Sequence, residues 1–177
     1  MSERGAARTA PQRMKKHIDK GRVLHALRER LAGNLKVLTA SQKTVQSGAV
    51  HEEARQEHPK DTRAIEAGYL ARGLAERVET LRDAVVLLAA LKLQDYGPAD
   101  PIGLCALVGL CAEAGEERVY FLVPSGGGER LVVDAVTIQS LTPGSPLGMA
   151  MVGHLVDDDL EVALPNGKLR TSIDWVQ

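Results

Sequence analysis

The sequence predicts an α+β protein in which a long antiparallel helical hairpin precedes a small β-sheet domain with one short helix. Apolar residues keep a helical spacing through the first half, whereas short alternating segments separated by glycine and proline fill the second half. The charge divides at the same place: residues 1–97 hold 18 Lys or Arg and 12 Asp or Glu, whereas residues 98–177 hold 4 and 11. A joint change of periodicity and charge indicates two structural units.

The first 16 residues are polar and basic and show no apolar periodicity, so we expect a disordered arm that is either inert or in contact with nucleic acid. The arm lacks the apolar run of a signal peptide, and no stretch approaches the roughly 20 apolar residues of a membrane span. Cys105 and Cys111 form neither a CxxC pair nor a disulfide framework. We therefore expect a cytoplasmic protein with reduced cysteines and no membrane partner.

The hairpin is predicted over residues 17–95, with one helix from about Asp19 to Ser47 and a second from Asp61 to Leu93. Each helix has an apolar seam of the coiled-coil type: Leu24, Leu27, Leu31, Leu38 and Val45 in the first; Ala64, Ala67, Ala71, Leu74, Val78, Leu81, Val85 and Leu88 in the second. Two such seams joined by a short polar segment predict an antiparallel pair, roughly 40 Å long at 1.5 Å per residue. The seam residues become smaller toward the turn, which predicts a tapered, protruding tip at about 48–60.

A linker is predicted at 96–101, where YGPADP combines two prolines and a glycine. The following domain, 102–177, is predicted to contain strands at 102–110, 118–123, 131–139, 160–164 and 169–176, with a PNG turn at 165–167. A short helix is predicted between the third and fourth strands, because Ser145 can cap it, Pro146 suits its first position and Gly153 can end it. Its apolar residues either all pack on the sheet or remain partly exposed for a partner: Leu147, Met149, Ala150, Met151 and Val152.

The segment HEEARQEHPKDTRAIE, residues 51–66, gathers five carboxylates and two histidines at the predicted turn. A zincin site needs two histidines four apart on one helix face, whereas His51 and His58 are seven apart and Pro59 follows, so we do not expect zinc. The remaining alternatives are a solvated loop and a tip that inserts into a partner. The sequence also lacks a glycine-rich phosphate loop and a Ser-His-Asp arrangement, so the residues alone indicate only a helical hairpin with an acidic tip on a small β domain.

The segment SPLGMAMVGHLVDDDLEVALPNGKLRTSI, residues 145–173, resembles the C-terminal domain of the Gre-type (GreA/GreB) bacterial transcription elongation factors. The family pattern is S-P-L-x-x-A-L-x-G-x-x-x-G-D-x-V-x-V-x-x-P-x-G, and it is matched by Ser145, Pro146, Leu147, Ala150, Gly153, Asp158, Val162, Pro165 and Gly167. HEEA at 51–54 and DTRAIEAGYLA at 61–71 also resemble this family. Since a long hairpin before a small sheet domain is its architecture, the resemblance covers about residues 17–177.

The resemblance implies an FKBP-like C-terminal domain that docks at the rim of the secondary channel of RNA polymerase while the hairpin enters the channel. It places the docking contact on Ser145, Pro146, Leu147, Ala150 and Gly153. Tip carboxylates would then help to hold a Mg²⁺ ion shared with the polymerase active centre, and the candidates are Glu52, Glu53, Glu57 and Asp61, with Glu52, Glu53 and Asp61 as metal ligands. Mg²⁺ prefers hard oxygen ligands, and a two-metal site cleaves phosphodiesters.

The resemblance further implies a monomeric cofactor of the polymerase's own transcript cleavage, with no tightly bound cofactor and only indirect contact with the nascent RNA 3′ end. A basic excess on the first helix is predicted to steer along RNA phosphate, through Arg28, Lys36 and Lys43.

The tip departs from the family's D-x-x-E-N motif. In the aligned segment, Glu57 replaces the first acid and Lys60 stands where the second belongs, one place before Asp61. A channel-binding regulator that does not stimulate cleavage is therefore one alternative, and a coiled-coil scaffold unrelated to transcription is another. The implied FKBP-like fold also suggests prolyl isomerase activity, which requires an aromatic-walled pocket. We do not expect this activity, because the domain offers only Tyr120, Phe121 and Trp175.

Overall fold

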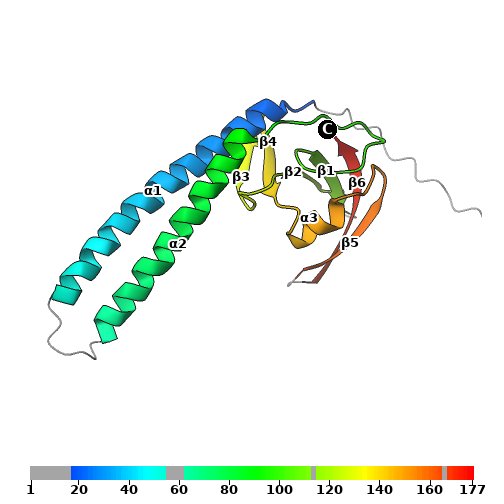
Figure 1. Cartoon of the computed structure of the whole chain (residues 1–177). Coiled ribbons are helices and arrows are strands. Elements are labelled where there is room, and N and C mark those ends of the chain that lie inside the picture. Colours follow the sequence, from blue (N-terminus) through cyan, green and yellow to red (C-terminus); the bar gives the residue numbers. More distant parts are fainter. Residues whose placement is uncertain (1–16, 55–61, 113–114, 165–166) are drawn as a thin grey trace, which may run out of the picture.

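The computed structural model describes residues 17–54, 62–112, 115–164 and 167–177, and leaves the side chains at 49–54, 62–64 and 164 undescribed. Helices α1 (Lys20–Ala54) and α2 (Thr62–Ala90) form an antiparallel hairpin that projects from a sheet domain (Figure 1). The domain contains six strands and the short helix α3 (Pro146–Met151). The predicted α+β class, a helical hairpin followed by a small sheet domain with a short helix, is confirmed, and the FKBP-like label stays a prediction. None of the described helices is long and apolar enough to cross a membrane.

The sheet is mixed, with the strand order β3-β4-β2-β1-β6-β5. Its strands are β1 (Leu107–Ala112), β2 (Glu117–Leu122), β3 (Arg130–Val133), β4 (Val136–Leu141), β5 (Asp159–Leu164) and β6 (Gly167–Val176). Only the β2–β4 pair is parallel among the described strands, and the other neighbours are antiparallel. Pairing shifts by one residue between Gly109 and Leu110, next to β6.

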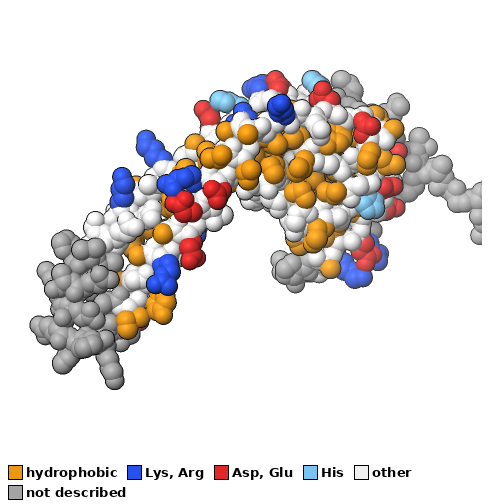
Figure 2. Space-filling model, viewed as in Figure 1, with side chains coloured by type: hydrophobic (Ala, Val, Ile, Leu, Met, Phe, Trp, Pro, Cys, Tyr) orange, Lys and Arg blue, Asp and Glu red, His pale blue; other side chains and the backbone are white. Residues whose placement is uncertain are grey.

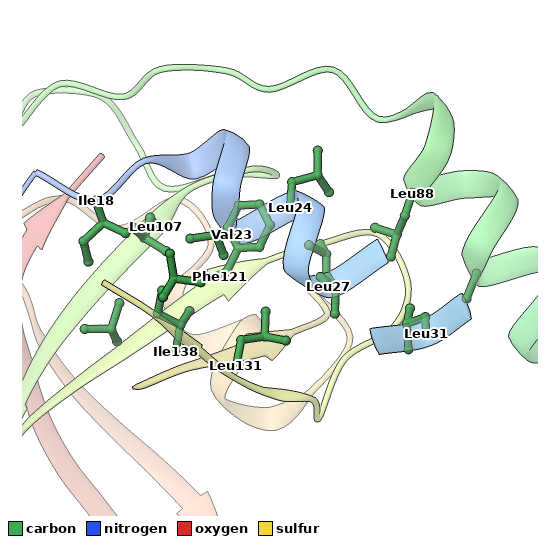
Figure 3. Packing of buried hydrophobic residues seen from close by; sticks show 14 of the residues in the cluster. Ile18, Val23, Leu24, Leu27, Leu31, Leu88, Leu107, Phe121, Leu131 and Ile138 are labelled. Atoms are coloured by element: carbon green, nitrogen blue, oxygen red, sulfur yellow. The ribbon is translucent and has the colours of Figure 1, made fainter. Parts of the chain in front are cut away.

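The root of the hairpin, which we define as residues 20–34 of α1 with the end of α2 at 81–90, covers one face of the sheet. Val23, Leu27 and Leu31 of α1 are almost fully buried in a cluster that includes Phe121, Ile138 and other residues of β1–β4 and β6 (Figure 3). Leu88 of α2 joins the same cluster. The hairpin and the sheet therefore share one hydrophobic core at the root.

A second cluster lies on the opposite face. Along β2 and the residue after it, Val119, Phe121 and Val123 belong to the first cluster, whereas Tyr120 and Leu122 belong to the second. Because successive side chains of a strand point to opposite faces, this alternation places the clusters on the two sides of the sheet. Helix α3 covers the second face. The domain is thus a sheet between the hairpin root and α3.

The element boundaries differ from the sequence prediction in three places. Helix α1 continues seven residues beyond Ser47, so residues 48–54 of the predicted tip are helical. The predicted strand 131–139 is two strands, β3 and β4, because Asp134 and Ala135 both have positive φ and reverse the chain. The predicted strand 102–110 begins only at Leu107, after a loop in which Cys105 also has positive φ.

Candidate functional site

The α3 segment is built as the sequence predicts. Ser145 is the N-cap: its Oγ accepts a hydrogen bond from the Gly148 amide (3.1 Å) and donates one to the Thr142 carbonyl (2.8 Å). Pro146 occupies the first helical position, where no amide hydrogen is required. Gly153 follows the helix with φ +85°, a conformation that glycine adopts without strain. The motif residues at 145, 146 and 153 therefore shape the segment.

The apolar residues of this segment divide between core and surface. Leu147 and Met151 are buried in the second cluster, whereas Met149 is 63% exposed and Val152 is 43% exposed. Leu155, in the turn after α3, is 41% exposed. We call Met149, Val152 and Leu155 the α3 patch; Figure 2 shows hydrophobic side chains at the surface over this helix. Leu147 packs in the second cluster and Ala150 is half-buried; their role in docking stays a prediction.

Three consecutive carboxylates follow Leu155 of the α3 patch at positions 157–159. Asp158 Oδ2 accepts hydrogen bonds from the Leu155 amide (2.9 Å) and lies 3.1 Å from His154 Nδ1. The bond from the Leu155 amide, followed by the contact with His154, lowers the pKa of Asp158. The neighbouring Asp157 and Asp159 are exposed. The surface that the segment offers is therefore apolar in its centre and acidic at its edge.

Two of the four predicted tip carboxylates belong to the described part of the hairpin, at the end opposite the root. Glu52 and Glu53 belong to the last turn of α1, while Glu57 and Asp61 lie outside the described residues, as does His58. Glu52 and Glu53 are consecutive residues at the end of α1 that lies away from the sheet (Figure 1). Within the described part of the chain, no group of three or more His, Cys, Asp or Glu could hold a metal ion.

The three residues predicted to steer RNA have different environments. Arg28 donates hydrogen bonds to the carbonyls of Leu88 (2.8 Å), Ala89 (3.1 Å) and Leu91 (3.4 Å), so it caps the C-terminal end of α2. Lys36 and Lys43 are exposed on α1 beyond the root. Of the three, Lys36 and Lys43 have exposed side chains, whereas the guanidinium group of Arg28 is engaged by backbone carbonyls. The sequence pattern alone does not distinguish these two environments.

Two further residues orient the hairpin and were missed by the sequence analysis. Glu129, in the loop before β3, accepts hydrogen bonds from Arg30 Nε (3.2 Å) and Asn34 Nδ2 (3.0 Å) on α1. Lys20, at the start of α1, is buried and donates to the carbonyls of Gln94 and Cys105 (3.4 Å to the latter). Burial lowers the pKa of Lys20. No sequence signal identifies such pairings, because each joins positions more than 70 residues apart.

The three aromatic residues of the domain do not share a pocket wall. Phe121 and Trp175 belong to the first cluster and Tyr120 to the second, and all three are buried. They therefore serve the two cores on opposite faces of the sheet.

No family model matches the sequence, and no curated protein matches it. Solved structures do. Structures similar to the chain include those of Gre-type factors. GreA factor homolog 1 (Gfh1) of Thermus thermophilus shares 23% identity over 86% of this chain and 95% of its own, with a TM-score of 0.36. Gfh1 of Thermus aquaticus shares 21% identity over 86% and 95%, with a TM-score of 0.38.

A third similar structure is the prokaryotic transcription elongation factor GreA/GreB from Nitrosomonas europaea, with 23% identity over 58% of this chain and 91% of its own and a TM-score of 0.36. The name of this third structure, GreA/GreB, is that of the family whose pattern residues 145–173 resemble. Because the TM-scores are below 0.5, the functional proposal rests on the residues of this chain.

Proposed function

We propose that this chain is a Gre-type transcription factor that docks on RNA polymerase through the α3 patch and carries carboxylates into the secondary channel on its hairpin. The observation that carries the proposal is the Ser145–Gly153 motif, which matches the Gre pattern and holds apolar side chains out of the core at Met149 and Val152. Single exposed apolar residues are common on protein surfaces, whereas several that gather in one patch mark an interaction site.

The hairpin supports the proposal by its reach. Contact with the sheet domain ends near Asn34, which bonds to Glu129. From Asn34 to Ala54 the helix continues for about 30 Å, at 1.5 Å per residue. A protrusion of this length can carry groups at its end into a channel while its root stays on the surface of the partner.

The chemistry at the tip is that of a metal ligand. Glu52 and Glu53 supply two carboxyl groups in the last turn of α1, and carboxylate oxygens are hard ligands. Mg²⁺ takes carboxylate oxygens and keeps several waters, so one or two acids suffice to hold an ion that the polymerase shares. In this proposal the polymerase performs the hydrolysis of the transcript, and the factor supplies ligands only.

The test uses purified RNA polymerase halted on a backtracked template, with transcript shortening as the readout. We expect the wild-type protein to accelerate shortening and the double variant Glu52→Ala, Glu53→Ala to bind polymerase without accelerating it. The matched control is Glu66→Ala, Glu76→Ala, which removes two acids behind the tip and should behave as wild type. Equal shortening by the tip variant and the wild type would show that these acids only solvate the tip.

A second candidate function is a channel-binding regulator without cleavage activity. It is favoured by Lys60, which stands where the Gre tip motif has its second acid. The same assay separates the two functions: this alternative predicts that wild-type protein binds polymerase and changes pausing or initiation without shortening transcripts. If the wild-type protein does not bind polymerase, both functions are excluded, and the coiled-coil scaffold unrelated to transcription remains.

A further inference from the structure

The chain uses its few aromatic side chains unevenly. It contains one tryptophan, three tyrosines and one phenylalanine. Tyr120, Phe121 and Trp175 are buried, and Tyr96 is half-buried with its hydroxyl donating to the Leu104 carbonyl at 2.7 Å. Tyr69, on the tip-proximal part of α2, is 68% exposed. Neither hydrophobic cluster of the fold includes this ring.

Two glycines flank Tyr69 within the helix. A glycine in a helix interior lowers stability relative to alanine, so it usually has a packing reason. Within the described part of the chain neither Gly68 nor Gly73 has one, because a Cβ atom added at either would meet nothing there within 4 Å. A residue at i+4 is a neighbour of residue i on a helix surface. The missing side chain at Gly73 therefore leaves the surface beside the Tyr69 ring uncovered.

A cation stands next to the exposed ring. Arg72 Cζ lies 5.9 Å from the centroid of the Tyr69 ring, within the range of a cation–π contact. A guanidinium group in this position can also hold a phosphate group bidentately. Figure 2 shows hydrophobic side chains and a basic side chain on the α2 arm next to the undescribed tip. The site thus joins an open aromatic face with an anion-binding group.

We propose that Tyr69 and Arg72 form a stacking site for one nucleotide, in which the base lies on the ring over the space left by Gly73 and the phosphate contacts Arg72. Aromatic rings stack on any base, and nearby arginine neutralises the backbone. The nucleotide that occupies this site belongs to the single-stranded 3′ segment of the transcript in the polymerase channel. The inference therefore rests on the proposed function. A free nucleotide triphosphate has the same chemistry, and the experiment distinguishes it.

The test compares the affinities of full-length protein for three complexes: polymerase alone, polymerase with a backtracked transcript, and polymerase with an unextruded transcript and added ATP. We expect Tyr69→Leu to weaken binding to the backtracked complex about tenfold, since stacking on an aromatic side chain contributes this much per base. Tyr69→Phe should bind as wild type, and Tyr69→Leu should not change binding to polymerase alone. An effect of Tyr69→Leu only in the ATP arm would assign the site to the free nucleotide and overturn the transcript as its source.

Gly73 provides variants that separate stacking from folding. Both Gly73→Ala and Gly73→Leu should raise the melting temperature, because alanine and leucine favour a helix more than glycine does. Only Gly73→Leu should weaken binding to the backtracked complex, as Tyr69→Leu does, because its larger side chain fills the space beside the ring. Equal weakening by Tyr69→Leu on all complexes would overturn the inference in favour of a contact with the channel wall. No weakening on any complex would also overturn it. If wild-type protein binds none of the complexes, the proposed function itself fails.

Discussion

At the scale of single residues, Gly148 has the least room for a side chain among the three glycines in and around α3, Gly144, Gly148 and Gly153. A Cβ atom at this position would lie 2.1 Å from the Thr142 carbonyl oxygen, which is backbone and cannot rotate away. We expect Gly148→Ala to lower the free energy of unfolding by about 1–3 kcal/mol through overpacking. Gly144→Ala is the matched control, because it meets nothing within 4 Å. Urea unfolding of both variants measures the difference, and equal stabilities would contradict the argument.

The thiol of Cys105 predicts a pH dependence. It is buried, donates to the Lys92 carbonyl at 3.3 Å, and has its pKa raised by burial above the usual 9.0. Above pH 9 the unfolded chain loses this proton while the folded chain keeps it, so the folded state binds more protons and stability falls as pH rises. The slope is at most about 1.4 kcal/mol per pH unit.

The control for this prediction is Cys105→Ala, which keeps a side chain at the same positive φ and leaves Lys20 and Tyr96 in place. The difference in unfolding free energy between the two proteins from pH 8 to pH 10.5 isolates the thiol. A constant difference across this range would show that Cys105 has the same pKa in both states.

At the residue scale, the sequence predicts well where the physical cause is local. Ser145, Pro146 and Gly153 take the cap, first-turn and stop positions because each depends on its own backbone conformation. The same sequence could not separate Leu147 from Met149, because both are apolar and only the position of the sheet decides which one is buried.

At the scale of the elements, Arg28 connects the two arms of the hairpin. Its guanidinium group donates to the carbonyls of Leu88 and Ala89 in the last turn of α2 and of Leu91 just after it. Carbonyls at the end of a helix lack the usual partner within the helix. We expect Arg28→Met to lower the free energy of unfolding by about 1–3 kcal/mol, as hydrogen bonds from a charged donor contribute. Lys36→Met, on the exposed side of α1, should change stability by less than about 0.5 kcal/mol. If the two variants are equally stable in thermal unfolding, Arg28 does not act as a cap.

The α3 patch predicts which substitution abolishes docking without loss of the fold. Met149→Glu places a charge in solvent, so the protein should fold as wild type and lose binding to RNA polymerase. Leu147→Glu places a charge in the second cluster and should unfold the domain, because an unpaired buried charge is strongly destabilising. Circular dichroism and co-purification measure the two effects. Polymerase binding by folded Met149→Glu would place the contact elsewhere.

The elements themselves were predictable to different degrees. The helices follow from long apolar seams, and the seam residues whose side chains the structure describes are all buried or half-buried. The turn between β3 and β4 was not predictable, because Asp134 and Ala135 reverse the chain without glycine or proline. The parallel β2–β4 pairing depends on contacts far apart in sequence and leaves no local pattern.

At the scale of the whole molecule, the hairpin and the sheet domain are not independent at the root. The seam residues Leu24, Leu27 and Leu31 were predicted to face the second helix, but they also enter the cluster that covers the sheet. An apolar stripe specifies that a helix face is buried and does not specify the partner that buries it. The change from a basic first half to an acidic second half of the sequence therefore coincides with the change from helices to strands. It does not separate two hydrophobic cores, because the hairpin root and the sheet share one.

This shared core predicts that a change in the hairpin root weakens the sheet. Leu27 is fully buried among residues of both units, so Leu27→Ala should lower the free energy of unfolding by about 2–5 kcal/mol. Urea unfolding can be followed by circular dichroism at 222 nm, which reports the helices, and by the fluorescence of Trp175, which belongs to the same cluster. The midpoints of both transitions should shift together to lower urea concentration. Leu38→Ala is the control, since Leu38 lies beyond the root and is only half-buried, and it should affect the Trp175 transition less. If Leu27→Ala shifts the helix signal and leaves the Trp175 transition unchanged, the two units unfold separately and the root does not fix the direction of the hairpin.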